Sequence, residues 1–237
     1  MNFLRISSPV LLFAVAIAVP ASACSDATMN GVVGYLVGAA VGQFTADGAG
    51  HISAGSQTVS NKGVISKQTF TGTYSVAANC TGKLTLNFTG GGMATANFVI
   101  DNVGKGAQII DSGSGTLASG FSLAQGVVTC GLTGQKQTFA ANLIGGKSGV
   151  HVAYVAQVIL NGKGGVSGSG TFNVNGAITA ATITGTYTET SHCLGTMKIT
   201  PSGLGAMNFN FVVVAAGDEI LLLETDANTV VAGYMQQ

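Results

Sequence analysis

Apolar and polar residues alternate along much of the chain. In the segment 69–76 the even positions are Phe70, Gly72, Tyr74 and Val76, while threonine or serine occupies the odd ones. A period of two indicates a half-buried β-strand, and the branched side chain of threonine suits the outer face of such a strand. The segment 83–88 repeats the pattern with Leu, Leu and Phe at its even positions.

Turn-forming pairs separate the alternating segments. Asn175-Gly176 lies between two such runs and predicts a two-residue hairpin. Asp47-Gly48 and Asn161-Gly162 mark a further hairpin in each half of the chain. After residue 23 no long segment shows helical periodicity. The pattern therefore predicts an all-β protein with roughly seven or eight short strands in each half.

The chain also aligns with itself at an offset of 113 residues (182 minus 69). The segment 69–74 recurs as 182–187, Cys80 falls on Cys193, and Asn-Phe-Val at 97–99 recurs at 210–212. A one-residue shift extends the match backwards, from 41–50 to 155–164. Internal repetition of this length indicates two copies of one β module, residues 24–126 and 127–237.

Many short strands and few helices favour closed barrels, because closure leaves no unpaired strand edge. We predict two tandem pseudo-repeats that form small antiparallel β-barrels, or one double barrel, with β-sandwiches as the alternative. The segment Ile-Leu-Leu-Leu at 220–223 is apolar on both faces, so we expect it to be covered on both sides. Its counterpart at 108–110 is less apolar.

The N-terminus has the features of a secretory signal peptide, residues 1–23. Arg5 supplies the positive charge, 10–19 is an apolar run, and Ala21-Ser22-Ala23 fits a small-residue cleavage site. Cleavage there would make Cys24 the first residue of an extracytoplasmic protein, whether periplasmic, on the cell surface or secreted.

The four cysteines are Cys24, Cys80, Cys130 and Cys193. An even count in an exported chain predicts disulfides. Because Cys24 and Cys130 open the two copies, the simplest pairing is Cys24–Cys80 and Cys130–Cys193. Lipidation of Cys24 is the competing interpretation, although the residue three places upstream is Ala21 where a lipid-attachment motif usually has leucine.

Composition narrows the class of protein. Charged residues make up 8% of the chain, apolar residues 46%, and the formal net charge is zero. Disorder is excluded, because disordered chains combine low hydrophobicity with high net charge. The absence of any Lys/Arg cluster argues against a nucleic-acid partner.

The repeated motifs resemble those of a known group of proteins. Thr-Gly-Thr-Tyr at 71–74, Asn-Cys-Thr-Gly at 79–82 and Asn-Phe-Val at 97–99 are similar to a duplicated module of uncharacterised exported bacterial proteins rich in Gly and Thr. The likeness covers nearly all of the chain after residue 23. It implies an extracytoplasmic all-β protein and brings no reaction, cofactor or partner.

Candidate chemistry is sparse, and we expect no catalytic, cofactor-binding or metal-binding residue. His192-Cys193 is a neighbouring pair whose side chains point to opposite faces of a strand, so it does not suit a metal. Asp111 and Glu224 occupy equivalent positions and could meet across a pseudo-twofold axis as a carboxylate pair. We expect instead that each ends a strand facing water.

Three classes of function remain. The main expectation is an exported, non-catalytic structural or interaction protein of the bacterial cell surface or extracellular space, working by self-association or through surface partners. The first alternative is a carrier for a small apolar ligand with a lipocalin-like lumen, which large side chains filling the barrel would exclude. The second alternative is an outer-membrane β-barrel, favoured by the mean hydropathy of +0.47.

Overall fold

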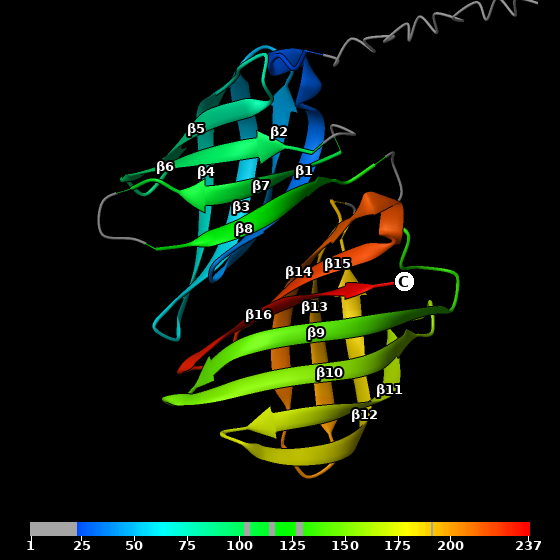
Figure 1. Cartoon of the computed structure of the whole chain (residues 1–237). Coiled ribbons are helices and arrows are strands. Elements are labelled where there is room, and N and C mark those ends of the chain that lie inside the picture. Colours follow the sequence, from blue (N-terminus) through cyan, green and yellow to red (C-terminus); the bar gives the residue numbers. More distant parts are fainter. Residues whose placement is uncertain (1–22, 102–104, 114–116, 127–129, 191) are drawn as a thin grey trace, which may run out of the picture.

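The computed structural model describes residues 23–101, 105–113, 117–126, 130–190 and 192–237. All of the predicted signal peptide except its last residue lies outside these ranges. The described chain forms two closed antiparallel barrels of eight strands each, in tandem along the sequence (Figure 1). The prediction of tandem barrels is therefore confirmed over the sandwich alternative.

The first barrel follows a short 3-10 helix, η1 (Asp26–Thr28). Its strands are β1 (Asn30–Val37), β2 (Ala40–Asp47), β3 (His51–Asn61), β4 (Val64–Val76), β5 (Thr81–Phe88), β6 (Met93–Ile100), β7 (Gly106–Asp111) and β8 (Ser119–Ala124). Each strand pairs with the next along the chain, and pairing of β1 with β8 closes the barrel.

The second barrel has the same topology, closed by pairing of β16 with β9. Its strands are β9 (Gln137–Lys147), β10 (Val150–Leu160), β11 (Gly165–Val174), β12 (Ala177–Glu189), β13 (Leu194–Pro201), β14 (Met207–Val214), β15 (Glu219–Glu224) and β16 (Thr229–Gln236). A second 3-10 helix, η2 (Ala215–Gly217), lies between β14 and β15.

The alternating pattern places side chains as predicted. On β4, Phe70 and Tyr74 are buried inside the barrel, whereas the threonines at 69, 71 and 73 are exposed.

The same hydrogen bonds form in an equivalent hairpin turn of each barrel. The side chain of Asp47 accepts hydrogen bonds from the backbone N–H groups of Ala49 and His51, and Asn161 does the same for residues 163 and 165. These residues shape hairpins in both copies.

Each barrel carries one disulfide, Cys24–Cys80 in the first and Cys130–Cys193 in the second. This is the pairing that the repeat predicts. The bridge uses the Cys24 sulfur that lipidation would need, so the lipidated alternative does not agree with the structure. Two disulfides are consistent with an extracytoplasmic protein.

The barrels pack side against side, and the strands that meet do not occupy equivalent positions in the two copies. Leu36 and Val41 on the outer face of β1 and β2 contact an apolar cluster on β14 and β15 that includes Val212, Leu221 and Leu223. Residues 220–223 are at most 2% exposed, which confirms the predicted cover on both faces. One face lines the second barrel and the other lies against the first barrel.

Candidate functional site

The first barrel contains an apolar cavity of about 480 Å³ that opens at one end of the lumen. This size lies within the range of small-molecule sites, about 300–1,000 Å³. The open end is where β3 meets β4 and where β5 meets β6. Val59 and Phe88, which point inward there, keep part of their surface exposed, and none of the described side chains closes the lumen above them.

Aromatic side chains form one wall of the cavity. Tyr35, Phe44, Phe70 and Phe88 contact each other in a continuous cluster, with ring centroids 5.8–6.5 Å apart. Leu84, Leu86 and Ile109 add aliphatic surface. Tilted and edge-on aromatic contacts of this kind hold the rings in place. The wall is therefore held together by contacts among its own side chains.

A chain of polar groups runs from the wall to the mouth. The Tyr35 hydroxyl donates a hydrogen bond to Gln57 Oε1 over 2.5 Å, and Gln57 Nε2 donates to Gln68 Oε1 over 2.7 Å. Tyr35 is buried, Gln57 is half-buried and Gln68 is exposed. Burial raises the pKa of Tyr35, so its hydroxyl keeps its proton. Gln68 thus presents an amide group at the mouth.

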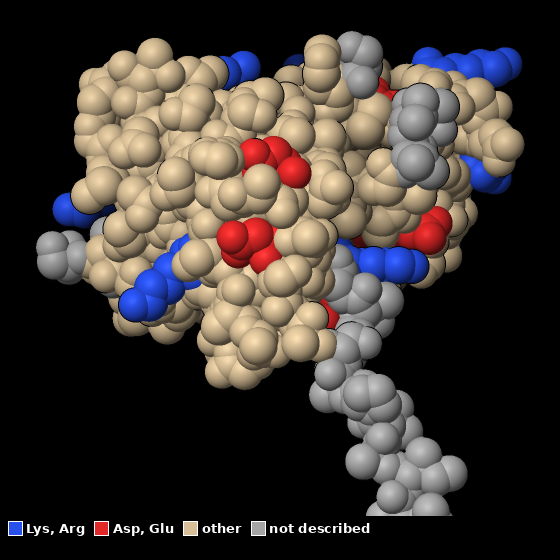
Figure 2. All heavy atoms as spheres, turned by 90° about the horizontal axis from the view of Figure 1, so that it is seen from above, with Lys and Arg blue, Asp and Glu red and all other residues tan. Residues whose placement is uncertain are grey.

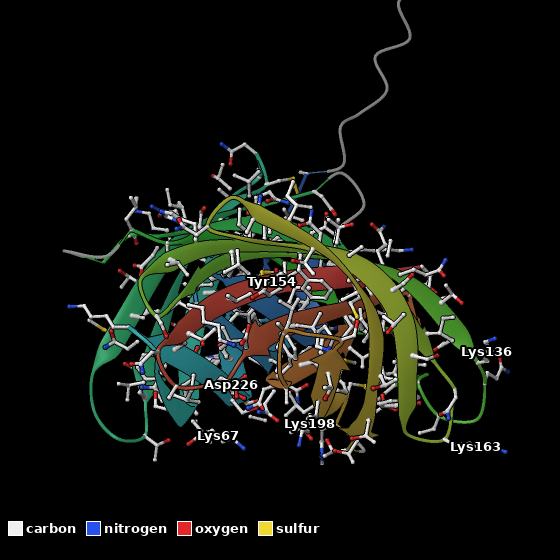
Figure 3. The ribbon with its side chains drawn as sticks, turned by 90° about the horizontal axis from the view of Figure 1, so that it is seen from below. Lys67, Lys136, Tyr154, Lys163, Lys198 and Asp226 are labelled. Carbon is white, nitrogen blue, oxygen red and sulfur yellow. A yellow bond between two sulfur atoms is a disulfide. The ribbon has the colours of Figure 1, made fainter. Side chains whose placement is uncertain are left out.

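The second barrel is filled at the matching positions. Strand pairing and the repeat offset place Tyr154, Phe172, Met207 and Phe209 where the first barrel has Ala40, Val59, Ala94 and Ala96. All four larger side chains are at most 3% exposed. The rings of Tyr154 and Phe172 lie 5.0 Å apart, and Figure 3 shows Tyr154 inside the barrel while Lys136, Lys163 and Lys198 lie at its periphery. The polar chain is absent there, because Ala141, Gly170 and Ala181 replace Tyr35, Gln57 and Gln68.

Glu224 lies at the same end of the second barrel and has no exposed surface. Lys147, at the end of β9, donates a hydrogen bond to Glu224 Oε1 over 3.3 Å. Among the described residues, Oε2 has no hydrogen-bond partner. Burial raises the pKa of Glu224 to about 7; Lys147 opposes the rise, and the nearby Asp226 carboxylate adds to it.

The two carboxylates singled out in the sequence lie in different barrels and form no pair. Asp111 is half-buried and lines the cavity mouth, where its Oδ1 accepts a hydrogen bond from the Gly113 backbone over 2.7 Å. The prediction that both face water is wrong for Glu224, because the longer strand β9 brings Lys147 over it. The barrels meet through β1 and β2 on one side and β14 and β15 on the other, so no pseudo-twofold axis joins the equivalent positions.

The remaining residues that could ligate a metal or carry charge do not come together in a site. In the described ranges, no three His, Cys, Asp or Glu side chains lie close enough to hold a metal ion. Cys193 is held in its disulfide. Charged side chains are sparse on the face shown in Figure 2. In the described part of the chain, no helix is both long and apolar enough to cross a membrane.

Sequence reasoning did not find the cavity, although the necessary signal was present. The repeat alignment pairs Ala94 with Met207 and Ala96 with Phe209, both on inward positions of a strand. A comparison of inward side-chain volumes between the two copies would have indicated one filled and one hollow barrel.

Comparison with known proteins adds no assignment. No protein family model matches the chain, and no curated protein or solved structure matches it. The resemblance to exported Gly/Thr-rich repeat proteins therefore stays a prediction.

Proposed function

We propose that the first barrel binds a small apolar molecule and that the second barrel is its structural partner. The observation that carries this proposal is the contrast between the two lumens. Small side chains at Ala94 and Ala96 leave space in one barrel, and Met207 and Phe209 fill the same space in the other. A repeat that needed only stability would gain from filling both lumens, since empty apolar volume is destabilising.

A fluorescent apolar probe tests this proposal. N-phenyl-1-naphthylamine is uncharged and fluoresces when it enters an apolar site, so titration of the protein should give saturable binding to one site per chain. The double variant Ala94→Met, Ala96→Phe imports the side chains of the second barrel, and we expect it to weaken probe binding at least about tenfold.

The matched control is Asn97→Phe, which places a phenyl ring on the outer face of the same strand, where Asn97 is exposed. This variant should bind the probe as the parent protein does. Circular dichroism and thermal unfolding establish that each variant is folded. Probe binding that is unchanged in a folded Ala94→Met, Ala96→Phe variant would disprove the proposal.

Self-association is a second candidate function, supported by a different surface. Val99 on β6 and Ile110 on β7 lie on the outer face of the first barrel, and each is 51% exposed. A chain with zero formal net charge offers little repulsion between copies. Sedimentation velocity over a range of concentrations tests this candidate, which requires the sedimentation coefficient to rise with concentration.

An outer-membrane barrel has less support, because the threonines at 182, 184, 186 and 188 make the outer face of β12 polar.

A further inference from the structure

We infer that the ligand of the first barrel is an uncharged molecule with an apolar body and a hydroxyl, carbonyl or amide head, and that Asp111 excludes carboxylates. This inference rests on the proposed function and deepens it. It concerns which chemical class the cavity selects, and three features of the mouth carry it.

The first feature is the charge of the cavity lining. Asp111 is the only charged residue among the described residues that line the cavity. The nearest lysine along β4 is Lys67, which lies between the inward-facing positions 66 and 68, so its side chain points to the outside of the barrel. A fatty-acid carboxylate placed at the mouth would find a like charge in the lining, and the described lining residues include no cation; Lys62, in the hairpin between β3 and β4, is not one of them. Such an arrangement opposes binding, because a partly desolvated charge needs an opposite partner.

The second feature is the difference between Asp111 and its counterpart. In the second barrel Glu224 is paired with Lys147 from a long β9. In the first barrel β1 ends at Val37, and among the described residues no lysine forms an ion pair with Asp111. The Asp111 carboxylate therefore contributes an uncompensated negative charge to the mouth. Its position is fixed by the hydrogen bond from the Gly113 backbone.

The third feature is the polar chain of Tyr35, Gln57 and Gln68. Two of its three members are amides, which both donate and accept hydrogen bonds. The bonds within the chain use Gln57 Oε1, Gln57 Nε2 and Gln68 Oε1. The Nε2 group of Gln68 can still donate to an acceptor in the mouth. An uncharged oxygen on the ligand fits this donor and avoids repulsion by Asp111.

Displacement of N-phenyl-1-naphthylamine separates the possible ligand classes. The two competitors are 1-dodecanol and dodecanoate at about pH 8, both below the concentrations at which they aggregate; they share a chain length and differ in the charge of the head. We expect the alcohol to displace the probe from the parent protein at a concentration at least about tenfold lower than the acid.

The variant Asp111→Asn keeps the shape of the side chain and removes its charge. We expect it to strengthen dodecanoate binding and to reduce the alcohol preference to about threefold or less, with dodecanol affinity unchanged. Asp218→Asn, which removes an exposed acid of the second barrel, is the matched control and should keep the parent preference.

The outcomes distinguish this inference from the proposed function beneath it. Equal displacement by alcohol and acid, or an acid preference, would overturn the inference and leave the lumen as a binding site. An alcohol preference that persists in Asp111→Asn would equally overturn the role of Asp111. If the probe shows no saturable binding at all, the proposed function itself fails.

Discussion

Glu224 is an acid that the second barrel encloses completely, and its burial links stability to pH. Its pKa rises from 4.5 to about 7 in the folded chain, mainly because burial disfavours the charged form. The folded chain therefore retains a proton that the unfolded chain releases between these two values. The stabilising contribution is complete below about pH 4.5 and is lost as the pH rises through 7.

Urea unfolding between about pH 5 and pH 8 measures this effect. We expect the free energy of unfolding of the parent protein to fall by up to about 3 kcal/mol across this range. Glu224→Gln removes the titrating group, so its free energy of unfolding should change much less over the same range. Asp218→Asn changes an exposed acid and should keep the parent's slope. An equal slope in Glu224→Gln and the parent would show that Glu224 does not cause the pH dependence.

At this scale, the sequence pattern predicted which side chains face into the barrel and which face outward. It could not predict which residues surround each side chain. The period of two assigned Phe70 and Tyr74 to the inside and their threonine neighbours to the outside, as observed. The same pattern could not indicate that Glu224 is covered. That cover depends on Lys147, which is 77 residues away in sequence and joins the site only through the closure of β16 on β9.

At the scale of strands, the repeated motifs explain how each barrel is built. Gly82 lies opposite Phe98 in the pairing of β5 with β6, and Gly195 lies opposite Phe211 in the second copy. The phenylalanine ring lies over the glycine in both barrels. The Cys-x-Gly and Asn-Phe-Val motifs are thus two halves of one packing contact, which positions the disulfide next to it. These motifs therefore have a structural role in each barrel, and the resemblance that rests on them says nothing about a reaction or a ligand.

Gly82→Ala tests this interpretation of the motif. A Cβ at this position would lie 2.2 Å from Cζ of Phe98 and 2.6 Å from the carbonyl oxygen of Ser75. Because backbone and ring would both have to move, we expect the free energy of unfolding to fall by roughly 1–3 kcal/mol in chemical denaturation.

Gly90→Ala provides the comparison, since a Cβ there would meet no atom within 4 Å. Its effect should stay within about 0.5 kcal/mol. If Gly82→Ala were as mild as Gly90→Ala, the motif would need another explanation.

At the scale of the whole molecule, the two copies share a fold and differ in how far side chains fill the lumen. The repeat predicted equivalent barrels, and the apolar segment 220–223 predicted a strand covered on both faces. Which surface covers it could not be predicted, because the barrels meet through different strands of each copy, β1 and β2 against β14 and β15. Two hydrogen bonds also connect the barrels, from the Ser60 hydroxyl to the Thr229 carbonyl and from the Asn210 amide to the Thr58 hydroxyl. The function we propose likewise depends on where the copies differ.

Alanine-methyl NMR shows directly which barrel binds the ligand, because both lumens carry alanine probes. Ala94 and Ala96 line the first lumen, and Ala141 and Ala181 are buried in the second. On titration with N-phenyl-1-naphthylamine, we expect saturable shifts of the Ala94 and Ala96 methyl signals and unchanged signals from Ala141 and Ala181. Shifts confined to the second pair, or equal in both barrels, would contradict this expectation.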